Sequence, residues 1–263
     1  MKELTVYEKK AKGRISGGFC AGTGFTVAVI LLCAVCALTW EIGRFAAGGS
    51  VVSVSHEQNA VITPLTVVID AGHGGMDGGA SGADGTVEKD INLAVAKRLS
   101  ALLKLSGIEC VMTREEDRML VGDDVKSHRK MHDLKNRLAM TEEISERGGN
   151  AIFVSIHMNN FSSPKYYGLQ VWYSGNNADS SQLASYVQSY AATFLDTSNK
   201  REIKRATSAI YILDRATVPA VLVECGFLSN PEECEKLKSE SYQTELAVTV
   251  FSALCAFVGN GNV

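Results

Sequence analysis

Three segments of the chain carry an ionisable side chain at the end of an apolar run. His73 lies in a glycine-rich stretch after the first run, His157 ends the second, and Glu224 ends the third. Each run is typical of a strand that is buried on both faces. Because the carboxyl ends of parallel strands converge on one crevice, we expect the three side chains to share a site. A turn histidine with a purely structural role is the alternative for His73 taken alone.

Two histidines and a nearby carboxylate have the donor chemistry of a hydrolytic zinc site. Such sites take three nitrogen or oxygen ligands from the protein and keep one position for water. His73 and His157 supply two imidazoles, and Glu88 follows the glycine-rich stretch closely enough to supply the third ligand. Glu88 also opens an expected helix, where the helix dipole favours a carboxylate. An ordinary helix-start charge is therefore the alternative for Glu88.

The elements that must position these residues alternate along the chain. Helices are expected at 88–106, 127–147, 179–195 and 241–258, and another begins at Asn230, with asparagine as the N-cap and Pro231 in the first position. Besides the three apolar runs, strands are expected at 109–113, 168–173 and 210–213. The alternation predicts a single α/β domain with a twisted, mixed or mainly parallel sheet flanked by helices.

The N-terminal part of the chain has the pattern of a membrane segment. Residues 1–14 are rich in lysine and arginine, and residues 15–40 carry no charge. An apolar run of that length exceeds the roughly 20 residues that span a bilayer. The positive charges precede the run, so 1–14 is predicted as a cytoplasmic tail, 15–40 as a transmembrane signal-anchor and 41–64 as a linker. The domain at 65–260 would be extracytoplasmic. A cleaved signal peptide is the alternative.

Composition and the remaining motifs exclude several classes of function. The net charge is -3 and no dense basic stripe is present, so no nucleic-acid partner is expected. Cys33 and Cys36 form a C-x-x-C pattern inside the apolar N-terminal run, which argues against a redox pair. His128 and His132 have helical spacing, but Arg129 stands where the zinc-protease motif requires glutamate. We therefore expect no metal at that pair.

Four motifs, in order, resemble the zinc-dependent N-acetylmuramoyl-L-alanine amidases whose catalytic domain is called amidase type 3. They are DAGHGG at 70–75, Glu88 followed by Asn92 and Leu93, SIHMN at 155–159 and VECGFLSN at 223–230. The resemblance covers about residues 66–258. Within this family the chain looks most like the sporulation amidases, which have a short N-terminal membrane segment and a catalytic domain without cell-wall-binding repeats.

The resemblance implies a function and a role for each residue. His73, Glu88 and His157 would bind Zn2+, and Glu224 would be catalytic. The reaction would be hydrolysis of the amide between the lactyl group of N-acetylmuramic acid and L-alanine of the peptidoglycan stem. The biological role would be formation of muramic δ-lactam in the spore cortex, or cell-wall remodelling. The implied partners are peptidoglycan, the membrane through the N-terminal segment, and a protein activator.

Several finer expectations accompany this assignment. Glu224 is expected to take a proton from water and return it to the leaving amine. Asp70 is expected to orient a zinc ligand, and Asn159 to do the same or to contact substrate, with structural roles as the alternatives. The interval between His157 and Glu224 is expected to hold no self-blocking helix. Four aromatic residues could stack on sugar, although aromatic side chains in strands and cores are commoner: Tyr166, Tyr167, Trp172 and Tyr173.

Two other functions remain open at this stage. One is a membrane-tethered peptidoglycan-binding protein that keeps the fold but does not cleave. The other is a zinc peptidase that cuts within the stem peptide and leaves L-alanine on the sugar. The complete set of His73, Glu88, His157 and Glu224 favours the amidase, because loss of any one of them would have favoured binding alone.

Overall fold

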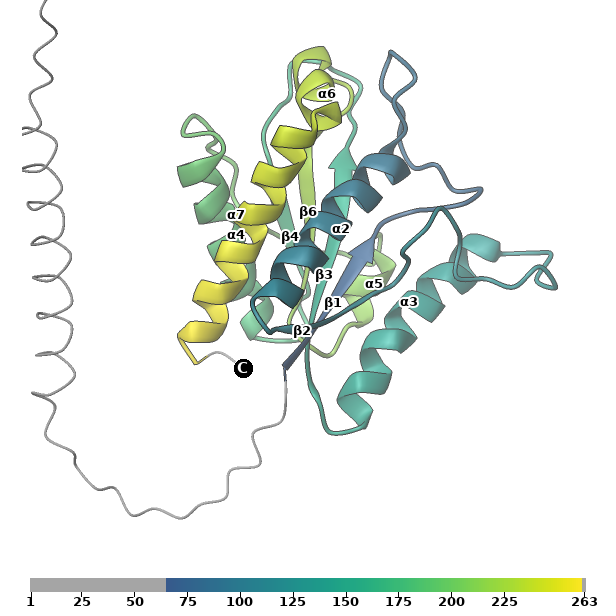
Figure 1. Cartoon of the computed structure of the whole chain (residues 1–263). Helices are drawn as coiled ribbons and strands as arrows, with labels where there is room; N and C mark the ends of the chain where they lie inside the picture. The colour runs from purple at the N-terminus through teal and green to yellow at the C-terminus, as the bar shows by residue number, and fades with distance from the viewer. Residues whose placement is uncertain (1–64, 262–263) are drawn as a thin grey trace, which may run out of the picture. The chain divides into compact units, whose positions relative to one another are not determined.

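The computed structural model describes residues 65–261, and within that range a six-stranded sheet runs in the order β2-β1-β3-β6-β4-β5 (Figure 1). The predicted tail, signal-anchor and linker at 1–64 lie outside the described residues. The strands are β1 (Leu65–Ala71), β2 (Glu109–Met112), β3 (Asn150–Asn159), β4 (Gln170–Tyr173), β5 (Lys204–Arg205) and β6 (Ala220–Phe227). The helices are α2 (Glu88–Leu105), α3 (Arg129–Glu146), α4 (Asp179–Phe194), α5 (Tyr211–Arg215), α6 (Pro231–Lys238) and α7 (Glu240–Gly259).

The three apolar runs form the centre of the sheet. β3 pairs in parallel with β1 on one side and with β6 on the other. These strands are rich in β-branched residues and almost wholly buried, as expected for parallel strands covered on both faces. β4 runs antiparallel to β6, so the sheet is mixed. The predicted α/β class is therefore confirmed, and the ends of β1, β3 and β6 meet at one edge.

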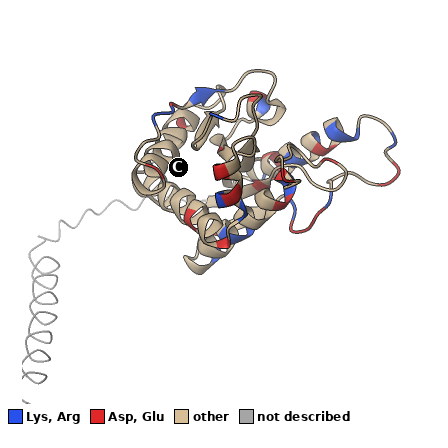
Figure 2. Ribbon diagram, turned by 90° about the horizontal axis from the view of Figure 1, so that it is seen from above, with Lys and Arg blue, Asp and Glu red and all other residues tan. Residues whose placement is uncertain are grey.

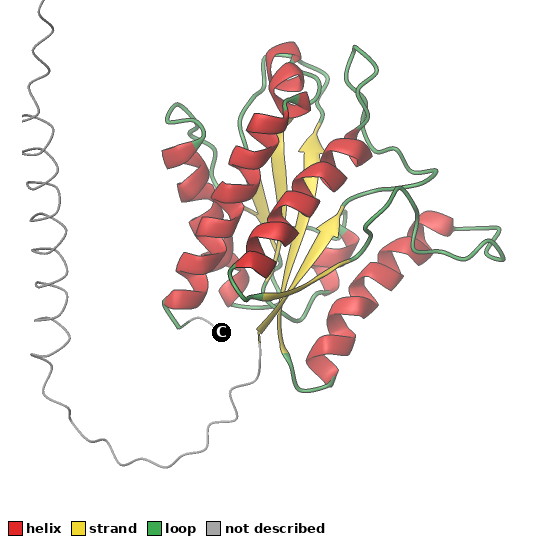
Figure 3. Ribbon diagram, in the orientation of Figure 1, coloured by secondary structure: helices red, strands yellow, loops and turns green. Residues whose placement is uncertain are grey.

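Helices cover both faces of the sheet (Figure 3). On one face α2, α4 and α7 pack together and build the larger part of the core, to which α2 contributes Ile91, Val95, Leu99 and Leu103. On the other face α3 and α5 cover a smaller cluster that includes Val68, Phe153 and Leu222. The smaller cover on this second face leaves room for a cavity beside the strand ends.

Among the described residues, α7 is the one helix long and apolar enough to cross a membrane. Its Leu246, Val250 and Phe257 are fully buried in the core that α7 shares with α2 and α4. The apolar character of α7 is thus used for packing within the domain.

Two local expectations had different outcomes. Asn230 caps α6 as predicted, since its Oδ1 accepts hydrogen bonds from the backbone N–H groups of Glu232 and Glu233 at 3.0 and 3.2 Å. The predicted strand at 210–213 is wrong, because these residues begin α5. Ile212 and Leu213 both face the smaller core cluster, and an apolar run of four residues does not distinguish a short helix from a strand.

Charge is distributed without a dominant sign. In the view from above (Figure 2), Lys and Arg segments alternate with Asp and Glu segments along helices and loops. This pattern agrees with the small net charge of -3.

Candidate metal centre and catalytic carboxylate

The loop after β1 turns sharply at the candidate metal centre. His73 has a φ of 61°, and Gly74 and Gly75 follow with φ of 136° and 56°. A positive φ is uncommon for a residue with a side chain, and it persists where surrounding contacts fix the backbone. Glycine accepts such angles without cost, so the two glycines let the chain reverse directly after the histidine.

The three predicted zinc ligands lie together. His73 Nε2 is 3.3 Å from Glu88 Oε2, and His157 Nδ1 is 2.9 Å from Glu88 Oε1. The donor atoms of all three residues lie within 4.8 Å of one another. The two imidazole rings meet edge to face, with centroids 4.9 Å apart. Three sequence segments thus place two nitrogen donors and one carboxylate around a single point.

Asp77 orients the ring of His73. His73 Nδ1 lies 3.0 Å from Asp77 Oδ2, and Lys130 Nζ lies 3.1 Å from the same oxygen. A proton on Nδ1 that is donated to Asp77 leaves the Nε2 lone pair free to bind a metal. Burial opposes protonation of His73, but the hydrogen bonds and charges of Glu88 and Asp77 raise its pKa above the ordinary value of 6.5. The sequence analysis missed Asp77.

The Glu88 carboxylate is buried and almost fully hydrogen-bonded. Its Oε2 accepts from the backbone N–H of Ala80 at 2.8 Å, and its Oε1 accepts from the backbone N–H of Met158 at 3.0 Å. Asn92 Nδ2 lies 3.3 Å from Oε1. Burial alone would raise the pKa of Glu88, but the hydrogen bonds to the two histidines hold it well below its usual range. Glu88 is therefore a fixed carboxylate anion.

Two glycines make room for the ligand side chains. A Cβ atom on Gly72 would lie 2.2 Å from Nε2 of His157. A Cβ atom on Gly79 would lie 2.5 Å from Oε2 of Glu88, and Gly79 also has a φ of 71°. No larger residue fits at either position unless a ligand moves.

A buried arginine from α3 holds the backbone around His73. Arg137 is 1% exposed, and its guanidinium donates to the Asp70 carboxylate at 2.7 Å. It also donates to the backbone carbonyls of Ala71 and His73 at 2.8 and 2.6 Å. Asp133, one turn earlier in α3, accepts from Arg137 Nε at 2.7 Å. These bonds give a physical reason why His73 keeps its positive φ.

Asp70 makes no hydrogen bond to a candidate metal ligand, so of the two roles expected for it the structure favours the structural one. Its carboxylate accepts hydrogen bonds from Thr113, Ser155 and Arg137, and none of the three candidate ligands contacts it. Burial would raise the pKa of Asp70, but the charge of Arg137 and the hydrogen bond from Ser155 lower it. Asp70 therefore fixes Arg137, and Arg137 fixes the carbonyl of His73.

Arg114 provides a second set of donors to the same loop. It is buried like Arg137, and its Nε donates to the carbonyl of Ala71 at 2.8 Å. Its terminal nitrogen donates to the carbonyls of Gly72 and Lys89 at 3.0 and 2.8 Å. The loop that carries His73 is thus tied both to α3 and to the start of α2.

Glu224 is placed beside the candidate ligands by strand pairing. It lies opposite His157 in the parallel register of β3 and β6. The register shifts directly afterwards, because Asn159 pairs with Phe227, so β6 carries one extra residue. Such a bulge reorients the side chains at the end of a strand. The backbone carbonyl of Asn159 accepts from Leu228 there, and no described contact links Asn159 to the metal ligands.

The carboxylate of Glu224 differs from that of Glu88. Its Oε2 is buried and has no hydrogen-bond partner among the described residues. Burial, together with the negative charge of Glu88, raises the pKa of Glu224 to about 7. A carboxylate with a free oxygen and a pKa near neutrality can both accept and release a proton at physiological pH.

A cavity of about 250 Å³ opens beside these groups, between α3 and α5. His73, His157 and Glu224 line its polar end, and Leu134, Ile210 and Tyr211 are among the apolar residues that line the rest. α4, the longer helix between His157 and Glu224, packs on α7 at the opposite face of the sheet. α5 forms part of the cavity wall.

Other titratable residues considered in the sequence do not join the site. His128 and His132 are exposed, and the metal-ligating group found among the described residues includes neither. Cys225, next to Glu224, is fully buried, and burial raises the pKa of its thiol far above the ordinary value of 9.0. It stays protonated and is no candidate nucleophile.

An open α/β sheet with a His–Glu–His group and a free carboxylate at its carboxyl edge defines a candidate metal-dependent hydrolase. Comparison with known families makes the class specific: residues 67–256 match the family described as N-acetylmuramoyl-L-alanine amidase. The chain belongs to this family.

Individual relatives cover nearly all of the described part of the chain. A germination-specific N-acetylmuramoyl-L-alanine amidase of Bacillus subtilis is 35% identical over 193 residues, which are 73% of this chain and 78% of that protein. Among solved structures, the CwlD amidase of Clostridioides difficile in complex with the GerS lipoprotein is 39% identical, with a TM-score of 0.69 over 74% of this chain and 98% of that one. The amidase AmiC2 of Nostoc punctiforme is 30% identical, with a TM-score of 0.62, and 74% and 97% of the two chains are covered.

Proposed function

We propose that the chain is a zinc-dependent amidase that releases the stem peptide from N-acetylmuramic acid in peptidoglycan. The observation that carries the proposal is the group of His73, Glu88 and His157 beside a Glu224 carboxylate that has an unpartnered oxygen. The first three residues can bind a metal ion, and Glu224 can accept and release a proton. Membership of the amidase family supports the choice of bond.

The donor atoms fit zinc. A tetrahedral zinc ion with bonds of about 2 Å places its ligand atoms roughly 3.3 Å apart. His73 lies 3.3 Å from Oε2 of Glu88, His157 lies 2.9 Å from Oε1 of the same carboxylate, and all the donor atoms lie within 4.8 Å of one another. Two imidazoles with one carboxylate form a donor set that catalytic zinc sites use. When bound there, zinc would supply positive charge that makes water more acidic and polarises a carbonyl group.

The residues of the chain divide the remaining work. Glu224 takes a proton from the attacking water through its free oxygen and delivers that proton to the nitrogen of L-alanine as the amide bond breaks. The products are a carboxyl group on the lactyl side and a free peptide amine. Asp77 holds His73 in one tautomer during this sequence, and the backbone donors of Ala80 and Met158 hold Glu88.

A digestion experiment tests the bond that is cut. The full-length chain, purified in detergent and stripped of metal, would be incubated with purified peptidoglycan with and without added zinc, and the products read by mass spectrometry. Peptides that begin with L-alanine, released only with zinc, are the expected result. Cleavage that leaves L-alanine on the sugar would identify a stem-peptide peptidase instead. Zinc binding without any cleavage would point to a protein that only binds peptidoglycan or to a missing protein activator, and sedimentation of the chain with peptidoglycan would test the binding.

The finer biological role is also a proposal. The similar proteins include a germination-specific amidase and a CwlD amidase, and this supports a role in the spore cortex. We propose that the chain strips peptides from selected muramic acid residues before they become muramic δ-lactam. Deletion of the gene in its host should then yield a cortex that lacks the lactam, as measured by muropeptide analysis. A normal lactam content would contradict this role.

Location and partners extend the same proposal. The uncharged run at 15–40 would anchor the chain in the membrane, with the domain from residue 65 on the extracytoplasmic side. The structure of the C. difficile relative contains a lipoprotein, which supports a protein partner for this chain as well. Protease added to intact cells should degrade the domain if it lies outside the membrane, and resistance would contradict that location.

A further inference from the structure

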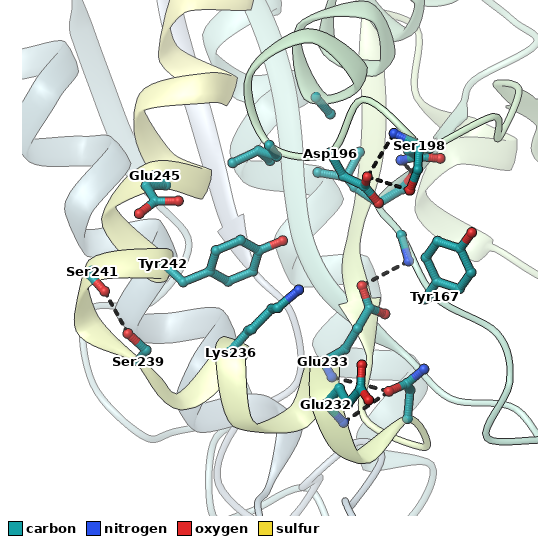
Figure 4. A pocket seen from close by; sticks show the side chains of 16 residues that line it. Tyr167, Asp196, Ser198, Glu232, Glu233, Lys236, Ser239, Ser241, Tyr242 and Glu245 are labelled. Carbon is teal, nitrogen blue, oxygen red and sulfur yellow. Dashed lines mark hydrogen bonds between the residues drawn. The ribbon is translucent and has the colours of Figure 1, made fainter.

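A groove separate from the catalytic cavity runs along the α6 side of the domain. One hollow of about 600 Å³ lies between the loop at 167–169, the loop at 195–199 and helices α6 and α7 (Figure 4). A second hollow of about 230 Å³ continues from it along residues 165–167 and 198–201. Tyr167, Ser198 and Asn199 line both hollows, so the two form one continuous groove. We call it the side groove.

Exposed aromatic rings stand at one end of the side groove. Tyr167 and Phe161 are 48% and 53% exposed, and Tyr166 is 37% exposed. Tyr166 is held between Phe161, with ring centroids 4.8 Å apart, and Phe227, whose ring stacks at 6.3 Å. Tyr166 is thus fixed in orientation by its neighbours, and the Tyr167 side chain beside it is half exposed. Exposed aromatic side chains in a defined arrangement are a feature of ligand-binding surfaces.

The backbone of this loop is anchored without help from the exposed rings. The carbonyl of Tyr167 accepts from Arg201 Nε at 2.6 Å, and the N–H of Gly168 donates to Glu233 at 2.8 Å. The carbonyl of Tyr166 accepts from Asn230 at 3.2 Å. These bonds hold the loop through its backbone, and the Tyr167 side chain itself is 48% exposed.

The polar groups in the groove are mixed in kind and in charge. Lys236, Tyr242 and Asp196 point into the larger hollow, and Ser198 lies beside Asp196 (Figure 4). The larger hollow is mainly acidic, since it is lined by Asp196, Glu232, Glu233 and Glu245 against Lys236, and the smaller hollow is lined by Lys165, Lys200 and Arg201. Over the whole side groove these charges balance, and its donors and acceptors suit a ligand with many hydroxyl and amide groups. A concave surface that joins such groups to flat aromatic faces matches the chemistry of a saccharide.

The aromatic end of the groove adjoins the catalytic edge of the sheet. Phe227 lies three positions after Glu224 on β6 and pairs with Asn159, two positions after His157. The backbone N–H of Phe161 donates to the hydroxyl of Ser229 at 3.1 Å, which fixes the loop to the end of β6. A polymer cut beside Glu224 would meet these rings where it crosses the edge.

We propose that the side groove is a saccharide-binding site that holds the glycan strand beyond the bond that is cut. The proposal rests on the proposed function for the identity of the polymer, but its test does not depend on catalysis. The groove would position long strands at the catalytic edge and would have little influence on short fragments that do not reach it.

The probe is a soluble oligomer of N-acetylglucosamine, which shares the sugar backbone of peptidoglycan but has no peptide and no cleavable stem. Binding to the full-length chain would be measured by calorimetry for the unaltered protein and for three variants. Tyr167→Ala removes the stacking face and should weaken binding about fivefold, the size expected for one aromatic contact. Tyr167→Phe keeps the ring and should bind like the unaltered chain.

Phe194→Ala is the matched control, because Phe194 is an exposed aromatic residue, 67% exposed, that does not line the side groove. Its affinity for the oligomer should be unchanged. No binding by the unaltered chain, or equal binding by Tyr167→Ala, would overturn the proposal, because the second result would mean that the oligomer binds outside the side groove. Failure of the amidase assignment would appear separately, as missing peptide release while oligomer binding persists.

Discussion

Glu88 and Glu224 are two carboxylates of one site, and their surroundings are opposite. Glu88 accepts hydrogen bonds from two backbone N–H groups and faces two histidines. Glu224 has a buried oxygen that finds no hydrogen-bond partner within residues 65–261. The pKa of Glu88 is accordingly held low, and the pKa of Glu224 is raised to about 7. The surroundings of Glu88 keep its carboxylate ionised and fixed in position, and those of Glu224 allow its carboxylate to exchange a proton.

The difference extends to the segments that carry the two residues. The loop around His73 and Glu88 is tied down by Arg114 and Arg137, and glycines leave no spare volume around its ligand atoms. Glu224 is placed by strand pairing alone and faces the cavity. A site that must hold an ion and move a proton needs both kinds of environment.

Among changes near the candidate metal ligands, Glu88→Gln should have the largest effect on zinc affinity. The change removes the negative charge between the two imidazoles, and the affinity for zinc should fall about a hundredfold or more. Competition with a chromogenic chelator measures the affinity. Asp90→Asn is the matched control, since Asp90 is an exposed carboxylate in the same helical turn. Equal zinc affinity of the Glu88 and Asp90 variants would remove Glu88 from the ligand set.

Gly72→Ala is expected to have a smaller effect on zinc affinity. The added methyl group would lie 2.2 Å from the His157 ring, so the ring must move from its present position beside Glu88. Zinc affinity should fall about tenfold while the circular dichroism spectrum stays unchanged. Gly259→Ala places a methyl group in open space and serves as control. Unchanged zinc affinity in Gly72→Ala would show that the ring position does not matter for the metal.

The smallest effect concerns Asp70, which supports the His73 loop through Arg137. It should appear as a dependence of the free energy of unfolding on pH. The folded protein lowers the pKa of Asp70 below 3.8, so the unfolded chain binds a proton at higher pH than the folded one. The stabilisation is present above pH 4 and is lost as the pH falls through the folded pKa. Urea unfolding between pH 6 and 3 should show a loss of unfolding free energy that depends on Asp70. An identical pH profile in Asp70→Asn would contradict this.

Most helices and strands could be predicted from the sequence, because local patterns of apolar residues determine where they form. The central strands are continuous apolar runs, and helices such as α2 have apolar residues at helical spacing. The short segment at 210–213 was misassigned, since its four apolar residues fit a strand or a helix equally well and packing on the smaller core cluster decided the outcome.

The site was only partly predictable. His73, His157 and Glu224 were visible because each lies at or just after the end of an apolar run in the sequence, and Glu88 entered through family resemblance as much as through its position. The roles of Arg114 and Arg137 depend on contacts across more than forty positions, and in the sequence Arg137 is an ordinary charged residue within a helix. Asp77 lies in a glycine-rich turn that gave no sign of its bond to His73.

The most direct test of the division between the two carboxylates is a paired measurement on Glu224→Gln in the full-length chain. Zinc content by atomic absorption and peptide release from peptidoglycan would be compared with those of the unaltered protein. The account predicts an unchanged zinc content and a rate of peptide release reduced by about a thousandfold, because glutamine fills the same space but cannot accept the proton. Loss of zinc together with activity would make Glu224 a metal ligand, and retained activity would remove it from the reaction.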